Sequence, residues 1–419
     1  MWKFLIIFIT GLILVLLPAR PIAPSDSGER MPLWNVQSVD TMKYSRDIAR
    51  LDEAKSLSYD SVIEKQISQI ASIGATHVAI GTPYDEEFLP YMQRWVAAAR
   101  RHNLLVWYRG NWSGWEGWFE YPPVSRAQHL EKTRNFILTH PELFMDGDIF
   151  TACPECENGG PGNPLVTGDD SGFREFIIDQ YRITGDAFSR INKKVASNYQ
   201  SMNGDLAHKI MDTETTTQMG GIVSIDHYVA TPDKLLSDIR SLAAKSGGQI
   251  VLGELGVPVP DIHGTMTPSQ QAAWLKRALA GLAEIPQVIA VNYWVNVGGS
   301  TALWHFGGET RPVVSELKRY FSMPVYNGIL ENHSGVPLSG VRIVYLNREF
   351  RSDTDGRFRL PVAPEQNRSF VFAQGYPDWE INLQSPTENG LTVIPDREKK
   401  KASLWTQLLL FLSRSILRK

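Results

Sequence analysis

The feature that most constrains the fold of this chain is a regular alternation of short apolar segments with longer segments of helical periodicity. Segment 33–40 is strand-like, and after it Ile63, Ile67 and Ile70 recur at a helical spacing before Gly74. Seven further strand-and-helix pairs follow, with strands expected at 76–84, 104–110, 148–155, 194–201, 221–229, 249–256 and 288–299. Such alternation predicts an α/β fold, a closed (β/α)8 TIM barrel, over residues 31–322.

The pattern changes at residue 323, where the helical periodicity stops. Segments 341–345, 358–360 and 370–372 alternate apolar and polar residues between Gly, Pro and Asp-Gly turns. This predicts a small all-β sandwich over residues 323–386. The sequences VPLSGVRIVYL and SDTDGRFRLPV resemble those of the carboxypeptidase-regulatory-like sandwich. Modules of that kind usually act as spacers or binding accessories, so the resemblance implies no chemistry here.

Both ends of the chain carry segments with the composition of membrane-interacting peptides. Residues 1–30 contain an apolar run, Phe4–Leu17, which suits a signal-peptide core or a membrane anchor, with cleavage left open. Residues 387–419 combine Lys and Arg with Leu and Trp, which indicates a basic amphipathic helix, either on an anionic membrane surface or docked on the protein. We therefore expect an exported protein that is secreted or anchored in the membrane.

The overall composition narrows the range of functions. The chain has 42 Lys and Arg against 45 Asp and Glu, so its charge gives no reason to expect nucleic acid as a partner. Two cysteines cannot form a disulfide framework, so the core must hold the fold. The 12 tryptophans are more informative, because several lie in one short loop and indole rings can stack on sugars.

The chemistry of such a barrel lies at the carboxyl ends of its strands. Glu155 ends the fourth expected strand and Glu254 ends the seventh. Two carboxyl groups at one mouth suit glycoside hydrolysis, in which one acid protonates the leaving oxygen and the other attacks or activates water. Polar and aromatic residues at other strand ends are candidates to bind the sugar: Arg109, Asn111, Trp112, Trp115, Asn198, His227, Tyr228 and Trp294.

These residues resemble the pattern of the clan A glycoside hydrolases, the retaining (β/α)8 enzymes, over residues 33–322. The resemblance implies that Glu155 is the acid/base and that Glu254, in the sequence GELG, is the nucleophile. The sequence DHYV resembles the His/Tyr pair of the clan's sixth strand. Strand alternation lets only one of the pair face the lumen, so Tyr228 is expected to contact Glu254 and His227 is the weaker candidate. Trp294 resembles the tryptophan that floors the sugar subsite.

The residue before the acid/base departs from the clan's pattern, whereas the arginine near the nucleophile has a candidate in this chain. Many members carry Asn directly before the acid/base, where it binds the substrate 2-hydroxyl, but this chain has Pro154 there. That contact would then come from elsewhere, with Asn198 as a candidate, or be absent. The arginine that lies near the nucleophile in the clan has its candidate in Arg109, at the end of the third strand.

Two points stay open in the segment TACPECENGG. Glu157 has the same side-chain parity as Glu155 but lies further along the loop, so we prefer Glu155 as the acid. Cys153 and Cys156 flank that acid. Structural zinc would need further ligands, and a redox CxxC would start a helix in a small domain. Buried thiols or an optional disulfide are the simpler interpretations.

The expected function is therefore hydrolysis, or transfer, at O-glycosidic bonds of a β-linked oligo- or polysaccharide. It would proceed by double displacement without a cofactor or a metal ion. The alternative is a carbohydrate-binding barrel at the cell surface that does not turn its ligand over. The sugar, the linkage and the oligomeric state stay open.

Overall fold

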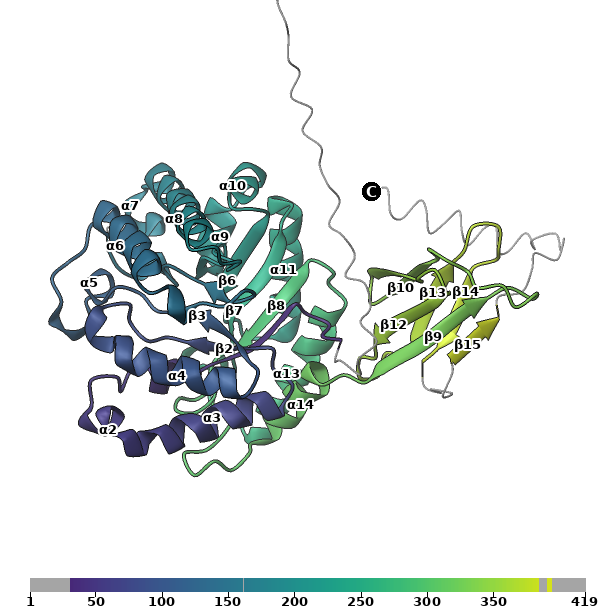
Figure 1. Cartoon of the computed structure of the whole chain (residues 1–419), viewed down its shortest axis with the longest axis horizontal. Coiled ribbons are helices and arrows are strands. Elements are labelled where there is room, and N and C mark those ends of the chain that lie inside the picture. The colour runs from purple at the N-terminus through teal and green to yellow at the C-terminus, as the bar shows by residue number, and fades with distance from the viewer. Residues whose placement is uncertain (1–30, 161, 384–389, 394–419) are drawn as a thin grey trace, which may run out of the picture.

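The computed structural model describes residues 31–160, 162–383 and 390–393. Its larger part is a barrel of eight parallel strands with helices on the outside (Figure 1). The strands are β1 (Val36–Asp40), β2 (His77–Ile80), β3 (Leu105–Tyr108), β4 (Ile149–Phe150), β5 (Ser201–Asn203), β6 (Ile222–Asp226), β7 (Gln249–Leu255) and β8 (Val288–Tyr293). They pair in the order β4-β3-β2-β1-β8-β7-β6-β5. The predicted (β/α)8 fold is confirmed.

The barrel closes between β4 and the segment that leads into β5. Ile149 forms a parallel bridge with Ala196, and the Phe150 N–H donates to the Ala196 carbonyl at 2.8 Å. β4 itself has only 2 residues, fewer than the expected strand over 148–155. Glu155 therefore lies in the loop that follows β4, and not at the tip of a long strand.

The helices around the barrel bury their apolar side chains against the strands. In α3 (Asp60–Ser72), Ile63, Ile67 and Ile70 are buried, as their spacing predicted. The other long helices are α4 (Leu89–Arg101), α6 (Arg126–Thr139), α8 (Asp170–Arg190), α11 (Pro232–Ser246), α13 (Pro268–Ala283) and α14 (Pro312–Phe321). Shorter helices are α1 (Met42–Ser45), α2 (Asp52–Lys55), α5 (Ser113–Glu116), α7 (Pro164–Thr167), α9 (Gly204–Ile210), α10 (Thr213–Gln218) and α12 (Pro260–His263).

An apolar layer fills the barrel interior below the mouth. Trp107 on β3 is its largest member, and its indole N–H donates to Thr151 Oγ1 at 2.8 Å. The layer consists of Val36, Ala79, Trp107, Ile149, Tyr199, Ile222, Val251 and Ala290. Arg109 follows Trp107 by two positions, so its side chain also points into the lumen, one layer nearer the carboxyl ends of the strands. The lower lumen is thus a packed core that supports the polar site above it.

Two small sheets follow the barrel. One has the strand order β11-β10-β13-β14 and the other β12-β9-β15. The strands are β9 (Val325–Glu331), β10 (Arg342–Tyr345), β11 (Arg348–Arg351), β12 (Arg357–Pro361), β13 (Arg368–Phe372), β14 (Trp379–Asn382) and β15 (Gly390–Val393). Because β15 pairs with β9, the second sheet extends past the expected boundary at residue 386. The resemblance to the carboxypeptidase-regulatory-like sandwich stays a prediction.

One arginine joins these sheets to the barrel. The Arg348 guanidinium donates to the carbonyls of Ala283, Ile285 and Val288 at 2.6, 3.1 and 2.9 Å. Burial lowers the pKa of Arg348 to about 10. Because Val288 begins β8, this junction lies at the amino ends of the barrel strands, opposite the mouth.

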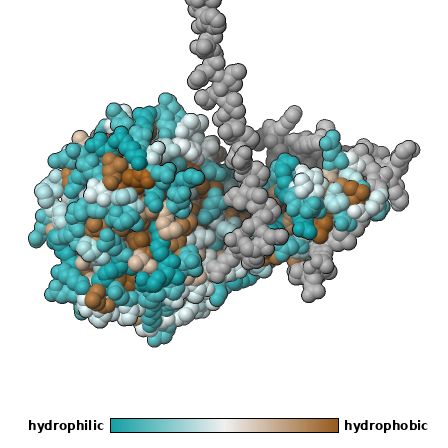
Figure 2. Space-filling model, viewed as in Figure 1, coloured by the Kyte–Doolittle hydropathy of each residue, from teal (hydrophilic) through white to brown (hydrophobic). Residues whose placement is uncertain are grey.

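Figure 2 shows a mainly hydrophilic barrel surface with scattered apolar residues. Within the described part of the chain, no helix is both long and apolar enough to cross a membrane. The expected leader, residues 1–30, lies outside the described residues, and so does the tail apart from residues 390–393, which form β15.

Candidate active site

A buried arginine organises the centre of the barrel mouth. The Arg109 guanidinium lies 3.4 Å from Asp40 Oδ2, 2.9 Å from Asp226 Oδ2 and 3.2 Å from Glu254 Oε1. Burial alone would lower the pKa of Arg109, but the three carboxylates raise it, so the side chain stays a cation. The structure places Arg109 beside Glu254, as the resemblance implied.

The carboxyl groups in this cluster outnumber its cation. Burial raises the pKa of Asp40 to about 6, against the opposing charge of Arg109. Burial also raises the pKa of Asp226, which accepts a hydrogen bond from Ser201 Oγ at 2.9 Å. One guanidinium cannot neutralise three ionised carboxyl groups. The remaining negative charge favours the protonated form of neighbouring acids. Sequence reasoning missed Asp40, although it ends the first strand and the strand-end rule would have found it.

A bulge in β7 sets the position of Glu254. The ladder between β6 and β7 shifts register so that Gly253 is an extra residue. The Gly253 carbonyl accepts hydrogen bonds from the Arg109 guanidinium and from Asn292 Nδ2. A Cβ on Gly253 would approach Asp226 Oδ1 to 2.4 Å, so only glycine fits here without displacement.

Glu254 receives a second donor from the loop after β6. Tyr228 Oη donates to Glu254 Oε2 at 2.7 Å, as expected, so each oxygen of this carboxylate has a donor. Burial, and then the charge of Glu254, raise the pKa of Tyr228, which keeps its hydroxyl proton available for this bond. His227 points elsewhere: its Nε2 lies 3.0 Å from Asp238 Oδ2 on α11. His227 is thus occupied in joining a loop to a helix, and we withdraw it as a sugar-binding residue.

Glu155 occupies an unusual backbone position in the loop after β4. Its φ and ψ are 46° and 51°, in the left-handed region. Its N–H donates to the Ser201 carbonyl at 2.9 Å, and its Oε2 accepts from Asn158 Nδ2 at 2.9 Å. Burial raises the pKa of Glu155 to about 8, and the negative charges of Glu254 and Glu157 act in the same direction. Glu155 is therefore mostly protonated at neutral pH.

The second acid of the same loop has a different environment. Glu157 is buried, and its Oε1 accepts the backbone N–H of Asn203 at 2.6 Å. Burial raises the pKa of Glu157. This bond joins the loop after β4 to the end of β5, so Glu157 faces protein, and the choice of Glu155 as the acid stays a prediction.

Asn111 is fully buried and does not face the mouth. Its Oδ1 accepts from the Trp112 N–H and from His129 Nε2, both at 2.8 Å, and its Nδ2 donates to Glu116 Oε1 at 2.6 Å. The expectation that Asn111 binds sugar is therefore wrong. Glu116 is an acid that sequence reasoning missed. Burial raises its pKa to about 7, and its charge acts on Glu155.

The two tryptophans expected to stack on sugar are core residues. Trp112 and Trp115 are only 5% and 3% exposed. The Trp112 indole N–H donates to Thr133 Oγ1 at 3.0 Å, and that of Trp115 donates to the Cys156 carbonyl at 3.1 Å. Trp115 also stacks on Phe176 with ring centroids 5.1 Å apart. Protein therefore covers both rings, and their sequence cluster reflects packing under the loop.

Asn198 lies at the wrong end of the barrel to contact a substrate. It precedes β5, and its Nδ2 donates to the Met219 carbonyl at 3.2 Å, just before β6 begins. The amino ends of the strands are opposite the mouth. The expectation that Asn198 takes the place of the usual asparagine is therefore wrong. Strand β5 begins later in the sequence than expected, at Ser201, so Asn198 lies before the strand and not near its carboxyl end.

Trp294 lies beside the expected nucleophile. Its ring packs edge-on against the Tyr228 ring with centroids 6.3 Å apart. Lys43 Nζ lies 5.7 Å from the Trp294 ring centroid, and the Trp294–Val295 peptide bond is cis. The structure thus places Trp294 next to the Tyr228–Glu254 pair, and its role as the floor of a sugar subsite stays a prediction.

Further aromatic residues, here called the aromatic rim, lie in the segments that follow the carboxyl ends of β1, β3 and β8: Tyr44 in α1, Trp118 and Phe306. Tyr44 and Phe306 have ring centroids 6.5 Å apart, and Phe306 is 80% exposed. Lys65 Nζ, on α3, donates to the Gly307 carbonyl at 2.6 Å, and this bond holds the turn after Phe306 against α3. The Arg46 guanidinium lies 4.6 Å from the centroid of the Trp118 ring. Trp118 belongs to the aromatic segment that follows the third strand in the sequence, whereas sequence reasoning did not assign Tyr44 and Phe306, because no strand end or periodicity marks them.

Cys153 and Cys156 form a disulfide, with Cα atoms 5.2 Å apart. The sequence left two simple interpretations of this pair, buried thiols or a disulfide, and the structure contains the disulfide. Over the described residues, no group of three or more His, Cys, Asp and Glu side chains is arranged to hold a metal ion.

No protein-family model matches the chain, and no curated protein matches it. Similar solved structures include GH5_18 from Streptomyces cattleya in complex with Manb1-4GlcNAc, which is 12% identical with a TM-score of 0.52 over 72% of this chain and 85% of that one. A family 5 xyloglucanase from Paenibacillus pabuli is 15% identical, with a TM-score of 0.45 over 62% of this chain and 90% of that one. At such identities the likeness shows the barrel fold alone.

Proposed function

We propose that the chain is a glycoside hydrolase that cleaves O-glycosidic bonds of a β-linked oligo- or polysaccharide. The observation that carries this proposal is a pair of unlike carboxyl groups at one barrel mouth. Glu254 has a hydrogen-bond donor on each oxygen, whereas the pKa of Glu155 is raised to about 8 by burial and by the charge of Glu254. A carboxyl group fixed by two donors, beside one that retains its proton, fits the division of roles that the reaction requires.

The contacts of the two acids suggest double displacement. Glu254 attacks the anomeric carbon, while Arg109 and Tyr228 hold its oxygens in a fixed orientation. Glu155 gives its proton to the leaving oxygen and later removes a proton from the attacking water. As Glu254 loses its charge in the ester, Glu155 gains one, so the net charge facing Arg109 is the same in the intermediate as in the free enzyme.

The aromatic rim supports a substrate with several sugar units. Trp294 lies beside the reacting centre, and Tyr44, Trp118 and Phe306 extend apolar surface outward from it. Such rings suit the apolar faces of neutral sugars. The GH5_18 structure, whose barrel is similar, was solved with Manb1-4GlcNAc, which supports a β-linked chain here.

We also propose that the protein works outside the cytoplasm. The apolar run at Phe4–Leu17 motivates this proposal, and the Cys153–Cys156 disulfide supports it, since disulfides persist mainly in oxidising compartments. Protease accessibility of a tag placed after residue 419 in intact cells would test it. Full protection of that tag until the cells are lysed would overturn it.

The test of the activity is a screen of defined β-linked oligosaccharides and polysaccharides for release of reducing ends. Glu254→Gln is expected to reduce turnover at least about 10³-fold, and Glu155→Gln by about 10²–10⁴-fold on unactivated substrates. Undiminished activity in Glu254→Gln would refute the assignment. Product analysis by NMR at early times should show retention of the anomeric configuration. Saturable oligosaccharide binding without any reducing ends would support the non-catalytic alternative.

A further inference from the structure

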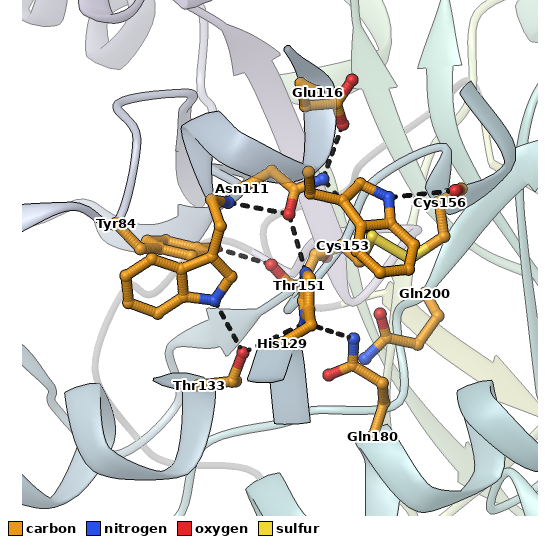
Figure 3. Close-up of a disulfide and its surroundings, with 12 residues drawn as sticks. Tyr84, Asn111, Glu116, His129, Thr133, Thr151, Cys153, Cys156, Gln180 and Gln200 are labelled. Atoms are coloured by element: carbon orange, nitrogen blue, oxygen red, sulfur yellow. Dashed lines mark hydrogen bonds between the residues drawn. A yellow bond between two sulfur atoms is a disulfide. The ribbon is translucent and has the colours of Figure 1, made fainter. Parts of the chain in front are cut away.

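The disulfide Cys153–Cys156 encloses the proposed acid. Figure 3 shows the disulfide, and the bond closes a small ring of the chain that, by sequence, contains Pro154 and Glu155. Both cysteines are buried, with 1% and 4% exposure. The ring begins after β4 has ended at Phe150. Glu155 is therefore not held between two neighbouring strands, as a residue within β4 would be.

Each half of the ring has its own contact with the loop after β3. Asn111 Nδ2 lies 3.3 Å from Cys153 Sγ, and the Trp115 indole N–H donates to the Cys156 carbonyl at 3.1 Å. Asn111 is itself fixed by His129, whose Nδ1 lies 2.9 Å from Gln180 Nε2 on α8 (Figure 3). The cystine is thus connected through buried polar groups to a helix on the outside of the barrel.

The ring holds Glu155 in a conformation that a free loop would rarely keep. A non-glycine residue in the left-handed region is disfavoured unless its surroundings impose it. Beyond the ring, Glu155 bonds to the Ser201 carbonyl through its N–H and to Asn158 through its carbonyl and its Oε2, and both Asn158 bonds are local to the same turn. Without the disulfide, we expect the loop to relax toward right-handed conformations and carry the carboxyl away from Glu254.

We propose that the Cys153–Cys156 disulfide is the positioning device of the acid/base, so that proton transfer from Glu155 requires the oxidised form. This inference rests on the proposed function. Reduction by a dithiol transfers two electrons and two protons to the cystine, giving two thiols, while the dithiol becomes a disulfide. Glycosyl transfer to Glu254 needs no such ring, because Arg109, Tyr228 and β7 hold Glu254 independently.

The experiment compares two aryl β-glycosides of a sugar that the protein hydrolyses. A dinitrophenyl leaving group needs almost no protonation, whereas a phenyl leaving group depends on the acid. In the full-length Cys153→Ser/Cys156→Ser variant, we expect the rate of glycosyl-enzyme formation with the phenyl glycoside to fall about 10–100-fold. The corresponding rate with the dinitrophenyl glycoside should change less than about 3-fold. Native protein reduced with dithiothreitol, with its two thiols counted, should behave in the same way, which covers the case in which the variant does not fold.

Glu155→Gln is the reference for this test. If that variant shows no discrimination between the leaving groups, the acid assignment, and with it the proposed function, is wrong. If it discriminates but the reduced protein and the serine variant do not, only the positioning role is wrong. A parallel fall on both substrates, or no fall on either, would likewise overturn the inference, because a purely structural bond would affect both substrates alike.

Discussion

The charge of Glu155 should limit the stability of the protein at high pH, and Glu155→Gln should remove that limit. The folded protein raises the pKa of this carboxyl from an ordinary value of 4.5 to about 8. At roughly 1.36 kcal/mol per pKa unit, a difference of that size corresponds to about 5 kcal/mol between the ionised and protonated folded states. The side chain is partly exposed, so solvent screening reduces the figure, and we expect roughly 2–3 kcal/mol.

The sign follows from where each state binds its proton. Below pH 4.5, Glu155 is protonated in both the folded and the unfolded chain, and the raised pKa costs nothing. Between 4.5 and 8 the folded state must keep a proton that the unfolded state has released, so its stability falls as pH rises. Above pH 8 the full penalty is present. Glutamine has no charge at any pH, so the variant should gain stability over the wild type only as pH rises.

Thermal unfolding at pH 5 and pH 9 measures this effect. Glu155→Gln should differ little from wild type at pH 5 and should unfold about 4–12 °C higher at pH 9, at roughly 2–4 °C per kcal/mol. Glu131→Gln, an exposed position on α6, is the matched control and should show no such change. Equal differences between Glu155→Gln and wild type at both pH values would refute the reasoning.

Three further substitutions test other parts of the site. Tyr228→Phe removes a hydrogen bond to a charged carboxylate, so kcat should fall about 10–100-fold with an unchanged Tm, and a wild-type kcat would show that the bond to Glu254 has no role. Gly253→Ala should lower the free energy of unfolding by about 1–3 kcal/mol because the new methyl group meets a buried aspartate at 2.4 Å, whereas Gly185→Ala, with open space in α8, should raise it by about 0.5–1 kcal/mol. Phe306→Ala should raise KM for long oligosaccharides about 3–10-fold and leave short aryl glycosides unaffected, and equal effects on both would argue against an outer subsite.

The parts of the molecule that follow a simple periodicity were predictable from the sequence. Buried parallel strands are apolar throughout and their helices are amphipathic, so the eight units could be counted and the residue ending each strand could be named. Glu254 and Arg109 were identified because each ends a strand, and Tyr228 was identified from the resemblance to the clan A glycoside hydrolases.

The parts that depend on loop geometry were not predictable. Trp112 and Trp115 look like exposed aromatic platforms in a linear sequence, but the loop folds back over α8 and buries them. Asn198 was placed at the mouth because the polar segment around it hides where β5 begins. No propensity predicts the left-handed turn at Glu155, which depends on a bond between two side chains and on the Ser201 carbonyl from another strand.

The junction at the amino ends of the strands decides which side of the barrel stays free of the neighbouring parts of the chain. The Gln37 side chain on β1 donates to the Phe321 carbonyl at the end of α14 at 3.0 Å, and Arg348 bonds the carbonyl that begins β8. Residues 31–35 and the sheets after α14 therefore both join the barrel on the side opposite the mouth. Both connections thus lie away from Glu155 and Glu254, and a substrate reaches the proposed site from the opposite side of the barrel.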